Sequence, residues 1–154
     1  MKDLSKRAKE IIAERDYITI ATVTSDGMPW NSPVYSAFDE NYNFYFGTHV
    51  GSQKAHNIAN NPNVFLVIYD STVAPGTGEG VYIQGKAEQL NNIEDIEQAH
   101  KILADRRPTE FWPIEALQGN APVRLYKIVP EHVWMNSDGE KDGVYIDTRT
   151  EVQL

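Results

Sequence analysis

The chain has 154 residues, of which 41% are hydrophobic and 23% charged, and its formal net charge is −8 at pH 7. This length and composition predict one globular domain over residues 1–154, with enough sequence to bury a sizeable core. The acidic balance argues against a general nucleic-acid-binding protein, and the absence of cysteine excludes disulfides, thiolate metal sites and cysteine nucleophiles.

Neither a targeting segment nor a metal site is predicted. The first residues form a charged, helix-like pattern rather than a signal peptide, and no apolar run approaches the length that spans a bilayer. We therefore expect a cytoplasmic protein that does not bind membranes. The four histidines lack the His-x-x-x-His and His-Glu-x-x-His spacings of metal sites, so no metal is expected.

Hydrophobic periodicity predicts three helices and six or seven strands in hairpin order. Helices are predicted at residues 3–15, 52–60 and 93–106, and strands at residues 17–24, 28–38, 42–48, 63–70, 81–90, 123–134 and 144–147. A strand-rich meander of this kind usually closes into a barrel, which removes exposed edges. The predicted fold is therefore mainly β with flanking helices, built on a six- to seven-stranded antiparallel barrel, with the first helix over one end.

Proline, glycine and polar clusters predict where strands end or bend. Pro29 and Pro33 interrupt the second strand, which we expect to be an edge strand or bulged, because proline cannot donate to a ladder. Gly85 predicts a bend in the fifth strand. Residues 71–80 predict a loop; their Gly-x-Gly-x-Gly run precedes a strand and lacks a Gly-Lys-Ser/Thr ending, so it is not read as nucleotide-binding. Residues 108–117 predict an aromatic loop or short helix, and residues 136–143 predict a polar turn.

Residues 44–67 carry the most informative pattern. They are typical of a strand, a turn bracketed by Gly47 and Gly51, a short helix, a proline stop and another strand. Ser52 occupies the expected helix N-cap, and Lys54 lies in the first helical turn. A lysine there opposes the helix dipole unless an anion, such as a phosphate, lies between them. A plain Ser-capped helix with a solvated lysine explains the pattern equally well.

This stretch resembles the flavin-binding core of the pyridoxamine 5′-phosphate oxidase-like family, the FMN-binding split barrels. The residues that carry the resemblance are Phe44, Tyr45, Phe46, Thr48, Ser52, Lys54, Asn57, Asn61, Pro62 and Val64. Residues 18–34 resemble the family's opening hairpin, so the likeness covers residues 17–90 and is weaker in the C-terminal strands. The resemblance implies an FMN-binding split β-barrel and a homodimer with FMN at the subunit interface.

The resemblance also implies a set of cofactor-binding residues. Thr48, Ser52 and Lys54 match positions that hold the phosphate, the strand around Asn31 matches the one beside the isoalloxazine ring, and Gln84 matches a position that reaches the flavin from the partner subunit. The full set is Trp30, Asn31, Ser32, Pro33, Val34, Thr48, Ser52, Gln53, Lys54, Gln84 and Trp112. Trp112 is a candidate for covering the ring, and a core aromatic residue is the alternative reading.

Several positions depart from the oxidases of the family. Ser32 stands where they carry an arginine, and Gln53 where they carry a basic residue, so the phosphate site is expected to be less positive. Ala37 is the nearest match to their substrate lysine. Arg124-Leu125-Tyr126 has the wrong last residue for their arginine-x-histidine motif. We therefore do not expect a true pyridoxamine 5′-phosphate oxidase.

Two functions follow from the resemblance. The first is an FMN-dependent oxidoreductase that accepts hydride or electrons from NADH, NADPH or a small oxidisable substrate, with no residue assigned as general acid or base. The second is a non-catalytic module that binds or stores flavin, haem or a deazaflavin on the same barrel. Independent support for a subunit interface is limited to an aromatic set, Tyr69, Tyr82, Trp112 and Trp134.

Overall fold

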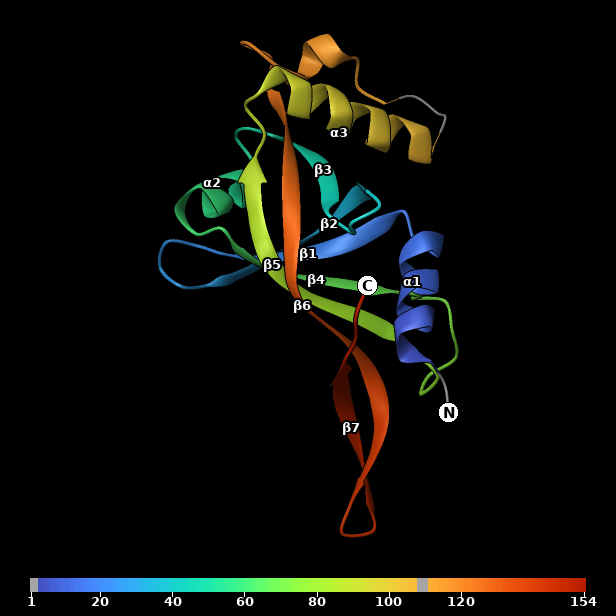
Figure 1. Cartoon of the computed structure of the whole chain (residues 1–154). Helices are drawn as coiled ribbons and strands as arrows, with labels where there is room; N and C mark the ends of the chain where they lie inside the picture. Colours follow the sequence, from blue (N-terminus) through green and yellow to red (C-terminus); the bar gives the residue numbers. More distant parts are fainter. Residues whose placement is uncertain (1–2, 108–110) are drawn as a thin grey trace.

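A computed structural model describes residues 3–107 and 111–154 of the chain (Figure 1). Its elements, in order, are α1 (Leu4–Glu14), β1 (Tyr17–Val23), β2 (Pro29–Phe38), β3 (Phe44–His49), α2 (Gln53–Asn60), β4 (Asn63–Tyr69), β5 (Gly80–Gln89), α3 (Ile93–Arg106), the 3₁₀ helix η1 (Ile114–Leu117), β6 (Val123–Lys141) and β7 (Val144–Glu151). The three predicted helices and the first five predicted strands are confirmed.

The seven strands form one antiparallel sheet in the order β3-β2-β1-β4-β5-β6-β7. β3 also pairs with β6, from Phe44↔Ile128 to His49↔Val123, so the two sides of the sheet meet and the sheet nearly closes. This is the split-barrel architecture. The predicted bend at Gly85 is confirmed, because the β5–β6 register shifts between Gln84 and Gly85.

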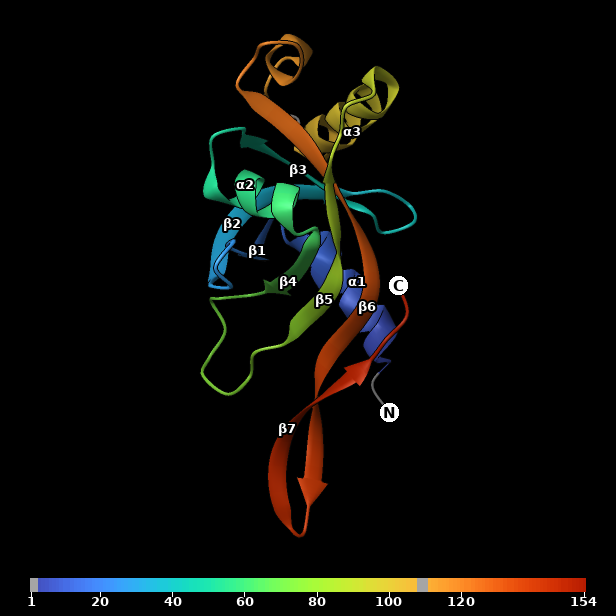
Figure 2. The same ribbon diagram turned by 90° about the vertical axis from the view of Figure 1, so that its left-hand side faces the viewer.

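The sheet is split between β2 and β3. These strands pair only at Ser36↔Phe46, Ala37↔Tyr45 and Phe38↔Phe44, whereas the pairing of β2 with β1 runs from Pro29 to Tyr35. The first seven residues of β2 therefore form an edge, as its two prolines predicted, and no bulge interrupts their pairing. Figure 2 shows α2 beside this region, following directly from the end of β3.

The barrel interior is filled by alternate side chains of the strands. Phe44 and Phe46 of β3 point into it together with residues of β1, β4, β5 and β6, and α1 closes one end with Ala8, Ile11 and Ile12. The opposite side of β3 is covered too. Tyr45 packs under α3 in a second cluster that contains Leu103, Leu117 and Leu125. β3 is thus buried on both faces, which holds its end rigidly in place.

The C-terminal strands are longer than the sequence predicted. Residues 136–141 belong to β6 and residues 148–151 to β7, so the predicted polar turn over residues 136–143 was wrong except for Asp142 and Gly143. Both of these have positive φ, 55° and 77°, as a two-residue hairpin turn requires. The polar composition of this segment suggested a turn, but its side chains form hydrogen bonds between the two strands. The Ser137 hydroxyl bonds to the hydroxyls of Thr148 and Thr150 on β7. The predicted aromatic loop or short helix at 108–117 contains η1, and residues 108–110 lie outside the described chain.

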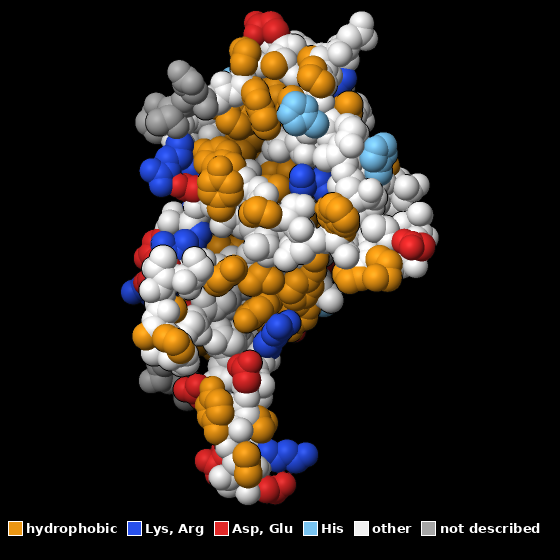
Figure 3. All heavy atoms as spheres, turned by 180° about the vertical axis from the view of Figure 1, so that it is seen from behind, with side chains coloured by type: hydrophobic (Ala, Val, Ile, Leu, Met, Phe, Trp, Pro, Cys, Tyr) orange, Lys and Arg blue, Asp and Glu red, His pale blue; other side chains and the backbone are white. Residues whose placement is uncertain are grey.

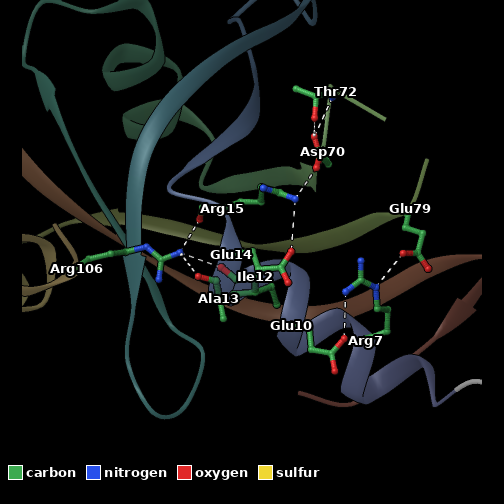
Figure 4. Close-up of polar contacts among 10 residues, drawn as sticks. All are labelled: Arg7, Glu10, Ile12, Ala13, Glu14, Arg15, Asp70, Thr72, Glu79 and Arg106. Atoms are coloured by element: carbon green, nitrogen blue, oxygen red, sulfur yellow. Dashed lines mark hydrogen bonds and ion pairs between the residues drawn. The ribbon is translucent and has the colours of Figure 1, made fainter. Parts of the chain in front are cut away.

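A single arginine joins the ends of two helices (Figure 4). The Nη2 of Arg106, at the end of α3, donates to the carbonyl oxygens of Ile12, Ala13 and Arg15 at 3.0, 3.2 and 2.6 Å. These carbonyls belong to the last turn of α1 and the residue after it, where helical partners are missing. Arg106 Nε lies 3.4 Å from Asp16 Oδ1, so the same side chain is ion-paired.

We expect Arg106→Ala to lower the free energy of unfolding by about 1.5–3 kcal/mol, the scale for hydrogen bonds that involve a charged group. Urea titration followed by circular dichroism measures it. Lys101→Ala is the matched control, because its exposed pair with Asp105 on the same helix contributes only about 0.3–0.5 kcal/mol. Equal effects of the two changes would show that Arg106 does not hold α1 in place.

Candidate functional site

A pocket of about 880 Å³ lies where β2 and β3 separate. It is lined by Asp16, Tyr17, Pro33, Val34, Tyr35, Gly47, Lys54, Arg107, Phe111, Trp112 and Pro113. The lining comes from the start of β1, the free edge of β2, β3, the start of α2 and the segment after α3. Figure 3 shows this side of the molecule, with hydrophobic side chains gathered around a hollow in its upper half. Four residues of the predicted set line the pocket: Pro33, Val34, Lys54 and Trp112.

Two hydroxyls, of Thr48 and Ser52, lie beside the ammonium group of Lys54, and Lys54 lines the pocket. Thr48 Oγ1 donates to Ser52 Oγ at 3.1 Å, and Lys54 Nζ donates to Thr48 Oγ1 at 3.3 Å. Ser52 is the N-cap of α2, as predicted, since its Oγ accepts from the amide of Ala55 at 3.3 Å. The helix geometry directs the amides of Gln53 and Lys54 outward from the same end. With the Thr48 proton directed at Ser52, the Ser52 hydroxyl, the Lys54 ammonium and these two amides can donate hydrogen bonds to an anion.

Aromatic side chains form the walls of the pocket. The Trp112 ring lies directly on Gly47, so closely that a Cβ at Gly47 would come within 2.5 Å of a ring carbon. Trp112 remains 37% exposed, which places it in the wall of a pocket rather than in a core. Tyr35 packs between Tyr17 and Phe111, with ring centroids 6.0 and 6.2 Å away. Burial, followed by the nearby Asp16 carboxylate, raises the pKa of Tyr35, whose hydroxyl donates to the carbonyl of Leu103.

Charged side chains mark the other end of the pocket. Arg107 is ion-paired with Asp16, and Asp16 also pairs with Arg106. The sequence prediction did not include Asp16, Arg107, Tyr17, Tyr35 or Phe111 among the site residues. Nothing in their local pattern distinguishes them, because their convergence depends on how α3 and the segment after it pack against β1 and β2. Within the described chain, no group of three His, Asp or Glu side chains is arranged to hold a metal ion.

A buried hydrogen-bond chain ties α2 to the edge of β2. The side-chain Nε2 of Gln53 donates to Asn57 Oδ1 at 2.8 Å, and the side-chain Nδ2 of Asn57 donates to Thr22 Oγ1 at 2.9 Å. Thr22 Oγ1 in turn donates to the carbonyl oxygen of Trp30. Asn57 and Thr22 are each only 1% exposed. Gln53 therefore helps to orient the helix, whereas Trp30, Asn31 and Ser32 lie on the edge strand outside the pocket lining.

Gln84 lies on a different surface. It pairs with Phe65 of β4 and His132 of β6 and is exposed on the outer side of the sheet. The neighbouring row on that side runs through Thr19, Val67, Tyr82 and Trp134, which are cross-strand partners. We call this surface, made of Thr19, Phe65, Val67, Tyr69, Tyr82, Gln84 and Trp134, the aromatic sheet face. Within one chain, Gln84 does not line the pocket.

Sequence comparison identifies relatives over most of the chain. The sequence model of the pyridoxamine 5′-phosphate oxidase family matches residues 4–137. A pyridoxine/pyridoxamine 5′-phosphate oxidase from Escherichia fergusonii is 31% identical over 97 residues, which are 63% of this chain and 43% of that protein. The matched region is thus less than half the length of this relative.

Solved structures share the fold. A heme-binding protein from Mycobacterium smegmatis superposes with a TM-score of 0.72 at 17% identity, covering 96% of this chain and 58% of that one. An F420 reductase superposes with a TM-score of 0.60 at 22% identity, covering 80% of this chain and 94% of that one. At these identities the likeness establishes the split-barrel fold.

We expect Gly47→Ala to push the Trp112 ring off β3, because the new methyl group has no space. In a background with Trp30→Phe and Trp134→Phe, so that Trp112 is the sole tryptophan, its emission maximum should shift to longer wavelength. Gly51→Ala is the matched control, since a Cβ at Gly51 meets no atom within 4 Å. An unchanged spectrum in Gly47→Ala would contradict the placement of Trp112.

Proposed function

The chain belongs to the pyridoxamine 5′-phosphate oxidase family, and we propose that it binds FMN in the pocket between β2 and β3. We propose further that it is an FMN-dependent oxidoreductase acting on a small molecule. The observation that carries the proposal is the convergence of Thr48, Ser52 and Lys54 at one end of an aromatic pocket.

The residues present fit the two chemically different parts of FMN. A phosphate close to a dianion needs several donors, and the hydroxyl–ammonium cluster with the start of α2 supplies them. The Lys54 ammonium already bonds to Thr48, so the cation is directed at this spot before any ligand binds. The flat aromatic ring system suits walls made of Val34, Tyr35 and Trp112. The free edge of β2 offers backbone groups that, within residues 3–107 and 111–154, are not paired with a strand on that side.

The bound flavin would supply the redox chemistry by accepting and donating hydride or electrons. The chain's own residues would bind the phosphate, orient the ring and exclude water. The described pocket lining offers no evident general acid or base, because Asp16 is held by two arginines and burial raises the pKa of Tyr35. A reaction that needs only hydride transfer, with NADH or NADPH as donor, suits such a pocket.

The substrate is not expected to be pyridoxamine phosphate. Ala37, the match to the oxidases' substrate lysine, is buried beneath α3 at 2% exposure. The guanidinium of Arg124 is engaged locally, because it donates to the carbonyls of Ala121 and Val123 at the start of β6. Tyr126 is stacked on Phe46, with ring centroids 5.2 Å apart. None of these three residues lines the pocket.

We also propose that a second copy of the chain packs on the aromatic sheet face, which would bring the partner's copy of that face toward the pocket. Tyr69 is 48% exposed there, and Phe65, Val67, Tyr82 and Trp134 are half-buried. Contiguous apolar surface of this kind marks interaction sites. The homodimer would allow Gln84 of the partner subunit to approach the flavin, as the family resemblance implies.

A non-catalytic module that stores flavin or binds haem is the second candidate. Its support is the same absence of an acid or base in the described pocket lining, together with the fold shared with a heme-binding protein. The two candidates differ in turnover. A yellow protein whose flavin absorbance bleaches with NADH or NADPH and recovers with an acceptor supports the oxidoreductase. A yellow protein inert to both donors supports storage, and a Soret band with haem supports haem binding. A protein that takes up no FMN overturns the main proposal.

We expect Lys54→Ala to weaken FMN binding by about 1.5–3 kcal/mol, or roughly tenfold to 150-fold, because it removes a hydrogen bond to a charged phosphate. Isothermal titration calorimetry or quenching of flavin fluorescence measures the dissociation constant. Lys6→Ala on the exposed face of α1 removes the same charge far from the pocket and should have no effect. Equal affinities for both variants would place the phosphate elsewhere.

We expect Val67→Lys to weaken self-association by at least tenfold while the protein remains folded, since the side chain lies on the outer side of β4 and not in the barrel. Sedimentation equilibrium measures association, and circular dichroism checks folding. Glu88→Lys, an exposed outward change on β5 beyond the aromatic sheet face, is the control. A dimer that tolerates a charge at Val67 would have its interface on another surface.

A further inference from the structure

We propose that the hairpin formed by residues 137–148, here called the arm, clasps the pocket end of a second copy of this chain. The proposal rests on the homodimer proposed above and adds which part of each subunit meets which part of the other. The arm projects from the barrel at the end of the molecule opposite α3 (Figures 1 and 2).

The arm has no cover from the described part of its own subunit. β6 pairs with β5 only as far as Met135, and beyond it β6 pairs with β7 alone. Val144, Tyr145 and Ile146 near its tip are 63%, 66% and 37% exposed. A two-stranded ribbon without a packed face is marginally stable in water. An extended, apolar-tipped ribbon is therefore expected to be covered by another molecule.

One side of the arm continues the aromatic sheet face. Side chains alternate along a strand, so Trp134 on that face is followed on the same side by Asn136, Asp138 and Glu140. The side chains opposite them on β7 include Arg149, whose guanidinium lies 3.8 Å from the centroid of the Tyr82 ring. In Figure 3 the hydrophobic patch below the hollow ends at basic and acidic side chains, and the projecting hairpin continues beyond them. A second copy seated on the aromatic sheet face would thus also lie against the arm.

The charges on that side identify the part of the second copy that it meets. Asp138, Glu140 and Asp147 make this side of the arm acidic. At the end of the pocket away from Lys54, Arg106 and the exposed Arg107 share the carboxylate of Asp16, which leaves this group of three side chains with a net positive charge. In a twofold dimer, any contact between the arm of one subunit and the pocket end of the other occurs twice, once in each direction. A twofold axis perpendicular to the aromatic sheet face would place each arm over the partner's pocket end.

The alternative arrangement is electrostatically unfavourable. An axis along the length of the molecule would bring the two acidic arms side by side, and juxtaposed like charges oppose association. The arm-over-pocket arrangement instead pairs opposite charges. It also places each pocket between its own β2–β3 split and the arm of the second subunit, so the pocket would be completed only in the dimer.

Cysteine cross-linking tests the arrangement directly, because the chain has no cysteine of its own. Tyr145→Cys at the arm tip and Pro113→Cys at the pocket rim are made as separate proteins, mixed, allowed to exchange and treated with a short bismaleimide. We expect a cross-linked heterodimer from the mixture and none from Tyr145→Cys alone. Cross-linking of Tyr145→Cys to itself, or no cross-link in a mixture that sedimentation shows to be dimeric, would overturn the proposal. Tyr145→Cys mixed with Glu40→Cys, in the exposed turn after β2, is the control pair.

Charge reversal gives an independent measure. Asp138→Lys with Asp147→Lys should weaken the dimer at least tenfold at low salt, with a smaller difference at high salt, because exposed charges are screened. Glu94→Lys with Glu97→Lys on exposed positions of α3 changes the net charge equally and is the control. FMN uptake measured on the same samples separates the two proposals. A dimer that binds FMN and is insensitive to the arm charges would overturn the arm contact alone, whereas a monomer that takes up no FMN would overturn the proposed function.

Discussion

The early separation of β2 from β3 is the constraint on which the rest of this structure depends. After three paired residues the strands diverge, so the barrel is open along the first seven residues of β2. Pro29 and Pro33 favour this, because a strand that contains prolines cannot pair fully on both sides. The pocket occupies the resulting gap, and α2, which follows β3 in the chain, lines it with Lys54 of its first turn. The opening is therefore part of the fold.

The pocket keeps its shape because its walls are fixed by elements that have other structural roles. Arg106 joins α3 to the last turn of α1, and Leu103 of α3 packs over the outer face of β3. The chain from Asn57 through Thr22 to the carbonyl of Trp30 ties α2 to the edge strand. Breaking a buried, satisfied network is costly, so these links hold the start of α2 and the strand edge at a constant separation. Such preorganisation suits a rigid cofactor better than an adaptable ligand.

Much of the fold was predictable because its signals are local. The period of the apolar residues predicted α1 and α3, and Ser52 with Asn60-Asn61-Pro62 marked the bounds of α2 within a residue. The end of the chain was misjudged. The segment from Asn136 to Gly143 has the composition of a turn, yet most of it is strand, since cross-strand bonds between Ser137 and its partners on β7 satisfy its polar groups. Composition cannot show that a polar segment has a partner strand.

The sequence by itself determined the order of the elements, the family and the clustering of Thr48, Ser52 and Lys54, because these three residues lie within seven positions joined by one tight turn. Only the tertiary structure decided what faces that cluster. Asp16, Tyr35 and Arg107 reach the pocket through the packing of α3 on the sheet, and Gln84 lies on another surface because β4 and β1 separate its strand from β2. Contacts between distant segments depend on strand order and helix packing, and no local pattern encodes these.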